Sequence, residues 1–232
     1  MRITSLQALN LARHARKAAI LATDLDGEVE QVILEGEPVA GSLSEAAASA
    51  FRTGKASVVD IAGRELFLNV YLPPPRLIVI GAVHISQALA RMAPVAGFDL
   101  TIIDPRTAFA TPERFAGADL VPEWPEEALA RRPLDPYTAV VALTHDPKID
   151  DFAILDALRK NCFYVGALGS RKTHAKRVER LRQHQLADED IAKIAAPVGL
   201  DIGAANPAEI AVAILAQVVQ AFRRREMIGG ST

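Results

Sequence analysis

The stretch that decides the fold covers residues 76–86 and reads Arg-Leu-Ile-Val-Ile-Gly-Ala-Val-His-Ile-Ser. Its first five residues form a short apolar run, which is typical of a strand buried on both faces of a parallel sheet. Gly81 ends the run, a helical pattern follows over residues 85–96, and a second apolar strand is expected at residues 100–103. A strand, a glycine turn, a helix and another strand within about thirty residues form a βαβ unit with parallel strands.

The alternation of strand and helix continues toward the C-terminus. Further strands are predicted at residues 139–143 and 163–165, and further helices at residues 151–160, 173–183, 188–195 and 206–225. This pattern predicts an α/β fold for residues 76–232, with a Rossmann-like, doubly wound parallel sheet.

Three consecutive prolines, Pro73 to Pro75, separate this region from the first part of the chain. Consecutive prolines favour an extended spacer, so we expect a domain boundary there. Residues 1–72 are predicted to form a small α+β domain, because helical patterns alternate with two hairpin patterns. The helices are expected at residues 3–13 and 42–52, and the hairpins around Gly27 and Gly63.

The composition excludes several classes of protein. The 232 residues include 26 basic and 28 acidic side chains, a balance that argues against a nucleic-acid binder. Cys162 is the one cysteine, so no internal disulfide is expected. No apolar run approaches the ~20 residues of a membrane span, and no signal peptide is evident. We therefore expect a cytoplasmic protein without a membrane partner.

The first candidate binding loop follows the strand at residues 76–80, because ligands of open α/β sheets bind at the carboxyl ends of strands. The N-terminus of the helix that follows this loop could bind an anion. A dinucleotide fingerprint requires glycine where this sequence has Val83 and Ser86, which disfavours ordinary NAD binding. Asp104 is placed for a ribose hydroxyl and Arg106 for a phosphate. The alternative is that this turn only connects a strand to a helix.

The second and third loops follow the next two predicted strands. Thr144, His145 and Asp146 could hold polar groups of a ligand or act in acid–base chemistry. Alternatively, this is a polar loop in which Asp150 or Asp151 caps the next helix. No second histidine or cysteine stands at ligand spacing, so no metal site is expected.

The third loop contains Gly169, Ser170, Arg171 and Lys172. It begins a segment, residues 159–182, that holds 8 basic and 1 acidic side chains. Gly169 has no side chain to cover the backbone, Ser170 can cap the following helix, and two cationic side chains stand beside the helix N-terminus. These features favour the binding of an anion such as phosphate. A plain solvated helix start is the alternative.

Residues 73–222 resemble the XdhC/CoxI family, which comprises accessory proteins for molybdenum hydroxylases such as xanthine dehydrogenase. The similarity rests on ordered motifs: LPPPRLIVIGAVH (72–84), IDPR (103–106), LTHD (143–146), YVGALGSR (164–171), PVGLDIG (197–203) and NPAEIA (206–211). It implies a non-catalytic maturation factor that binds molybdenum cofactor, as molybdopterin or its dinucleotide form, and aids its sulfuration or insertion. The implied partners are an apo molybdenum hydroxylase and a cysteine desulfurase.

The N-terminal part departs from the family pattern. Many members carry a Gly-Gly-Cys-Val-Glu-like segment, whereas residues 41–49 here read GSLSEAAAS. The family's cysteine and glutamate are missing, so cofactor capture by that cysteine is excluded.

The loops and the resemblance together give one set of expected cofactor-binding residues: Gly81, Ala82, Val83, His84, Asp104, Arg106, Thr144, His145, Asp146, Gly169, Ser170, Arg171 and Lys172. Two other functions stay open, an NAD(P)-dependent oxidoreductase and an interaction scaffold without a ligand. The apolar faces at residues 3–11 and 210–222 could serve a homodimer as well as a core.

Overall fold

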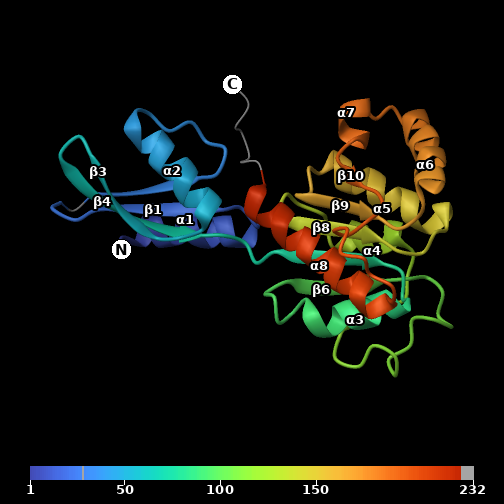
Figure 1. Cartoon of the computed structure of the whole chain (residues 1–232). Helices are drawn as coiled ribbons and strands as arrows, with labels where there is room; N and C mark the ends of the chain where they lie inside the picture. Colours follow the sequence, from blue (N-terminus) through green and yellow to red (C-terminus); the bar gives the residue numbers. More distant parts are fainter. Residues whose placement is uncertain (28, 226–232) are drawn as a thin grey trace. The chain divides into compact units, whose positions relative to one another are not determined.

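The computed structural model describes residues 1–27 and 29–225 (Figure 1). The chain forms two compact units. One comprises Met1–Pro73 with the described residues that follow Phe222, and the other comprises Pro74–Phe222. Each unit has its own sheet.

The first unit is built on a four-stranded antiparallel sheet in the order β2-β1-β4-β3. The strands are β1 (Ala19–Asp24), β2 (Glu30–Leu34), β3 (Ser57–Ile61) and β4 (Arg64–Tyr71), and the helices are α1 (Ile3–His14) and α2 (Ser42–Thr53). Both predicted hairpins are present, because β1 pairs with β2 and β3 with β4. Ala62 and Gly63 both have positive φ, which matches the right-handed twist of the strands that they join.

The second unit is built on a six-stranded parallel sheet in the order β10-β9-β8-β5-β6-β7. The strands are β5 (Arg76–Ile80), β6 (Asp99–Ile103), β7 (Asp119–Val121), β8 (Thr138–Ala142), β9 (Tyr164–Ala167) and β10 (Ile194–Ala195). From β5 the chain runs outward through β6 and β7, then returns to β8 on the other side of β5. The strand order therefore reverses beside β5, the point at which sheets of this kind bind ligands. The predicted α/β fold is confirmed.

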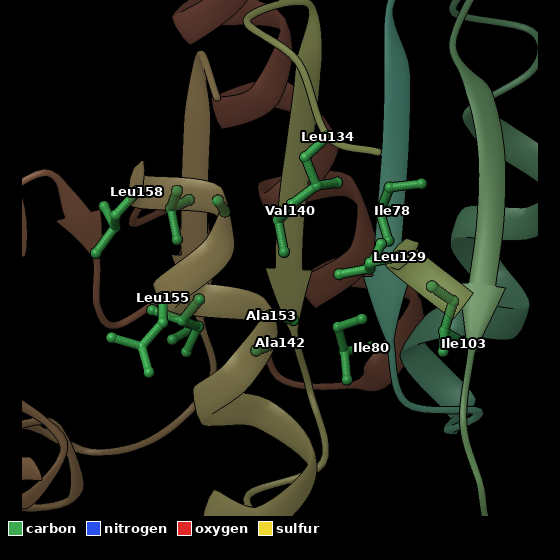
Figure 2. Packing of buried hydrophobic residues seen from close by; sticks show 14 of the residues in the cluster. Ile78, Ile80, Ile103, Leu129, Leu134, Val140, Ala142, Ala153, Leu155 and Leu158 are labelled. Atoms are coloured by element: carbon green, nitrogen blue, oxygen red, sulfur yellow. The ribbon is translucent and has the colours of Figure 1, made fainter. Parts of the chain in front are cut away.

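Helices and strands of this unit bury a shared apolar core. The helices are α3 (His84–Met92), α4 (Pro125–Arg131), α5 (Pro147–Arg159), α6 (Arg171–Gln183), α7 (Asp188–Ile191) and α8 (Pro207–Arg224). Figure 2 shows Ile78 and Ile80 of β5 packing in one cluster with Leu129 of α4 and Leu155 of α5. Because side chains alternate along a strand, this cluster covers one face of the sheet.

Several elements differ from the sequence-based prediction. Helix α5 begins at Pro147 rather than at residue 151, because Asp146 caps it and proline suits its first turn. Residues 188–195 do not form one helix. Helix α7 ends at Ile191, and β10 then pairs with β9. Pro197 follows closely, and the residue before a proline is disfavoured in helical conformation. The short elements β7 and α4 were not predicted.

Among the residues that the structure describes, no helix combines the length and apolar character that a membrane crossing requires.

Candidate functional site

The three predicted loops lie next to one another, because they follow strands β5, β8 and β9, which are adjacent in the sheet. Hydrogen bonds extend the sheet into these loops. The Leu143 N–H donates to the Ile80 carbonyl at 2.8 Å, and the Leu168 N–H donates to the Ala142 carbonyl at 2.9 Å. The sequence prediction that the loops share one edge of the sheet therefore matches the arrangement of the strands.

Gly81 begins the first loop in a conformation that a side chain would disturb. Its φ is +118°, and a Cβ at this position would lie 2.9 Å from Cγ2 of Thr144. The first loop therefore packs directly against the second. Glycine is required here both by the backbone conformation and by the closeness of Thr144.

Asp104 holds the glycine turn rather than facing solvent. Its fully buried carboxylate accepts a hydrogen bond from the Ala82 N–H at 2.7 Å on Oδ2. Arg106 donates to the same carboxylate from its backbone N–H (2.9 Å), from Nε (2.9 Å) and from Nη2 (2.8 Å). Burial acts to raise the pKa of Asp104, but these hydrogen bonds outweigh it, and the pKa lies below the usual value. Contact of Asp104 or Arg106 with a ligand stays a prediction.

Ser86 joins the two ends of the same turn by hydrogen bonds, a role that comparison of the sequence with the dinucleotide fingerprint did not reveal. Its buried hydroxyl donates to the Gly81 carbonyl and accepts a bond from the Val83 N–H at 3.4 Å. Val83 is the N-cap residue of α3, and the exposed His84 begins the helix. A serine three positions after the N-cap is the signal that could have revealed this role.

The second loop is organised by Thr144 and by a buried carboxylate. The Thr144 hydroxyl donates to Oδ1 of Asp150 at 2.7 Å and accepts from the Asp146 N–H at 3.0 Å. Asp146 caps α5 by accepting a bond from the Lys148 N–H at 3.0 Å. Asp150 is only 1% exposed, and burial raises its pKa. His145 is exposed, with a φ of +63°.

The cap of the second loop corrects one alternative of the sequence analysis. We expected Asp150 or Asp151 as the capping residue if the loop were merely polar, but the capping side chain is that of Asp146. Asp151 instead forms an ion pair with Arg180 of α6, at 2.5 Å and 3.0 Å.

The third loop presents the N-terminus of α6. Ser170 caps this helix by accepting a bond from the Thr173 N–H at 3.2 Å. Gly169 has a φ of +136°, and a Cβ there would lie 3.2 Å from Thr173. Arg171 and Lys172 follow the cap and are exposed. Two cationic side chains thus lie at the positive end of the α6 helix dipole.

A cavity of about 280 Å³ opens between the second and third loops. Residues of α5, α6 and the loop before α5 line it: His145, Pro147, Asp150, Asp151, Lys172, Thr173, Lys176, Arg177 and Arg180. Of the predicted site residues, His145 and Lys172 belong to this lining, and the glycine turn does not contribute to it.

Arg177 is the main feature of this cavity that sequence reasoning missed. Its side chain is 2% exposed, and its Nη2 donates to the Leu168 carbonyl at 3.1 Å. Its Nε and Nη1 have no hydrogen-bond partner within residues 1–27 and 29–225, nor does Oδ2 of Asp150. Arg177 lies four residues before the buried Leu181, a spacing that places both on the inner face of α6.

Among the described residues, Cys162 and the acidic side chains do not form a metal site. In the part of the chain that the structure describes, no group of three or more His, Cys, Asp or Glu side chains could hold a metal ion. Burial raises the pKa of the Cys162 thiol, which favours the protonated form over the reactive thiolate.

Residues 77–218, more than half of the chain, match the family model described as the XdhC Rossmann domain. The chain belongs to the XdhC Rossmann-domain family. This confirms the resemblance on which the sequence analysis relied. The structure is also similar to a crystal structure from Bacillus halodurans described as a xanthine dehydrogenase, with a TM-score of 0.64 and 26% identity. That similarity covers 96% of this XdhC chain and 65% of the other chain.

Two curated proteins are similar to this XdhC chain over about two thirds of its length. A protein of Bacillus subtilis (strain 168), named as a probable subunit of xanthine dehydrogenase, is 35% identical over 160 residues, which are 68% of this chain and 46% of that protein. The "Molybdenum cofactor insertion chaperone PaoD" of Escherichia coli (strain K12) is 31% identical over 157 residues, which are 67% of this chain and 43% of that protein. The matched regions thus span less than half of either relative.

Proposed function

We propose that this XdhC chain is an accessory protein of a molybdenum hydroxylase, which binds molybdenum cofactor and aids its sulfuration or insertion. The observation that carries the proposal is the convergence of the three loops on one edge of the sheet in a member of this family. The relatives named as part of a xanthine dehydrogenase and as a cofactor insertion chaperone support it. We propose an apo molybdenum hydroxylase as the partner, in the cytoplasm.

The donor groups at this edge fit a phosphorylated pterin. The N-terminus of α6, with Arg171 and Lys172, would hold negatively charged oxygens, and the buried Arg177 offers two further donor nitrogens, Nε and Nη1. We propose that the glycine turn, at the same edge of the sheet, receives the body of the cofactor. When bound, the cofactor would supply the molybdenum chemistry, and the chain's own residues would bind and orient it. We accordingly propose a non-catalytic role.

Sulfur transfer through a cysteine of this chain is not part of the proposal, because the Cys162 thiol is protonated and half-buried. A cysteine desulfurase is therefore proposed as the sulfur source. We also propose that a homodimer would form through the exposed side chains of α1: Ile3, Leu6 and Leu11.

The oxidoreductase alternative loses its main support in the structure. It rested on Asp104 as the acceptor of a ribose hydroxyl, but both oxygens of Asp104 already accept hydrogen bonds from Ala82 and Arg106. We expect no saturable binding of NADH or NADPH.

The proposal is tested by an anaerobic titration with cofactor released from a purified molybdenum hydroxylase, followed by protein fluorescence. We expect saturable binding that weakens at least about tenfold when Arg171→Ala and Lys172→Ala are combined, since each removes a charged contact. Lys160→Ala, an exposed lysine at the far end of α5, is the matched control and should bind normally. Absence of saturable binding by the wild type would refute the proposal and would favour the alternative of an interaction scaffold without a ligand.

A further inference from the structure

The cavity between α5 and α6 contains a buried cation with unused donors. A guanidinium withdrawn from water loses several hydrogen bonds, and the loss is costly unless other acceptors replace them. Arg177 uses one N–H on the Leu168 carbonyl, whereas Nε and Nη1 have no acceptor among the described residues. Nε and Nη1 lie on different edges of the guanidinium, so each can offer a separate charge-assisted hydrogen bond to an anionic oxygen.

The rim of this cavity adds exposed positive charge. Lys172 and Lys176 are both exposed, and they lie one turn apart on α6, so they face the same side. Arg180 is different, because Asp151 binds it with two hydrogen bonds. An anion entering the cavity would therefore meet two exposed lysines before it reached Arg177.

The position of Asp150 bears on whether an anion in this cavity should carry a proton. One of its oxygens accepts hydrogen bonds from the hydroxyl (2.7 Å) and the N–H (3.3 Å) of Thr144. Its other oxygen, Oδ2, has no donor within the described residues and belongs to the same cavity lining. A carboxylate oxygen can only accept, so a fully ionised anion such as sulfate would place two acceptors against each other. A phosphoryl group that carries a proton would donate to it.

We propose that this cavity is a phosphoryl-binding site, in which Arg177 donates a charge-assisted hydrogen bond to an anionic oxygen and Asp150 accepts the proton of a P–OH group. The ligand class is inorganic phosphate, or a phosphate monoester bound as its monoanion, which is the form that carries a P–OH group. A volume of about 280 Å³ is several times the roughly 30 Å³ of one water molecule, so part of an attached ligand also fits. The inference rests on the proposed function only for the physiological ligand, because a pterin cofactor carries such a monoester.

The test is calorimetric titration of the full chain with inorganic phosphate and, separately, with sulfate, at pH 7.5 and constant ionic strength. We expect one saturable phosphate site and at least about tenfold weaker sulfate binding, since a hydrogen bond to a charged group is exchanged for a repulsion. Arg177→Gln should also weaken phosphate binding at least about tenfold, because it removes a charge-assisted hydrogen bond to the anion. Asp150→Asn should narrow the preference for phosphate over sulfate, because an amide can donate to either anion.

Arg177→Gln could impair folding, so the double variant Lys172→Ala/Lys176→Ala provides an independent test on exposed residues. It should weaken phosphate binding severalfold, whereas Arg182→Ala, which removes a charge from the far end of α6, should not. Unchanged phosphate affinity in the lysine variant, no saturable phosphate binding, or equal affinity for sulfate would each overturn the inference. Phosphate binding without cofactor binding would refute the proposed function alone, and cofactor binding without phosphate binding would refute this inference alone.

Discussion

The substitution Gly81→Ala tests how the first and second loops are packed together. At a φ of +118°, an alanine occupies a region that side chains rarely adopt, at a cost of about 1–3 kcal/mol. Its Cβ would also lie 2.9 Å from Cγ2 of Thr144 and 3.4 Å from the carbonyl carbon of Leu143. Thr144 cannot turn away freely, because its hydroxyl is held by Asp150 at 2.7 Å. Strain and overlap together are expected to destabilise the Pro74–Phe222 unit by about 2–4 kcal/mol.

Urea denaturation followed by circular dichroism measures this cost. Gly97→Ala is the matched control, because Gly97 also has a positive φ (+84°) but a Cβ there would have no atom within 4 Å. It should therefore cost only about 1–2 kcal/mol, the penalty for the backbone conformation. In a Thr144→Ser background the Cγ2 atom is gone, and Gly81→Ala should cost about 1 kcal/mol less than in the wild type. Equal costs for Gly81→Ala and Gly97→Ala, or a cost independent of Thr144→Ser, would refute the packing argument.

Three further predictions concern titratable groups. Asp104→Asn should destabilise by about 2–3 kcal/mol at pH 7, since it removes one partner of a buried ion pair whose other member is partly exposed. The folded-state pKa of Asp104 is lowered, so the stability that its carboxylate contributes is present above the unfolded pKa of about 3.9. This stability is lost as the pH falls through the lower folded pKa. The urea midpoints of the wild type and of Asp104→Asn should therefore converge in acid. Asp150→Asn should show the opposite trend, because burial raises the folded-state pKa of Asp150. The wild type loses stability as the pH rises above the unfolded pKa of about 3.9 and through the raised folded pKa, so the variant should gain relative to the wild type over that range. A constant difference between the two proteins would contradict this. Cys162, whose pKa is raised by burial, should react with a thiol reagent at least about a hundredfold faster in urea than in buffer, and equal rates would show that the thiol is accessible.

The sheet of the second unit could be predicted because its information is local. The apolar run at residues 76–80 and Gly81 fix a strand and a turn, and the motifs after β8 and β9 indicate where the other loops fall. Parallel strands end at one edge, so the adjacency of the three loops follows from the strand order alone. The two-residue strand β10 escaped prediction, because its pairing with β9 is a tertiary interaction that leaves no periodic pattern.

The polar interior of the site could not be predicted, because it depends on how the helices pack. The sequence gives no sign that Asp104 accepts hydrogen bonds from the Ala82 N–H and from Arg106, and its contact with a ligand stays a prediction. Arg177 stands in a strongly basic segment that indicates a solvated helix face, yet its side chain is buried beside Asp150. Arg177 and Asp150 are buried because α6 packs against α5, and these two helices are about 25 residues apart in the sequence.

The accessory role is tested most directly by delivery of the cofactor. Cofactor is bound anaerobically to this XdhC chain, free cofactor is removed, and a molybdenum hydroxylase stripped of its cofactor is added while its activity is measured. We predict that the enzyme recovers activity, that it does so more completely than with the same amount of free cofactor, and that the Arg171→Ala/Lys172→Ala variant loses this advantage. Recovery equal to that with free cofactor, or lower, would contradict the account.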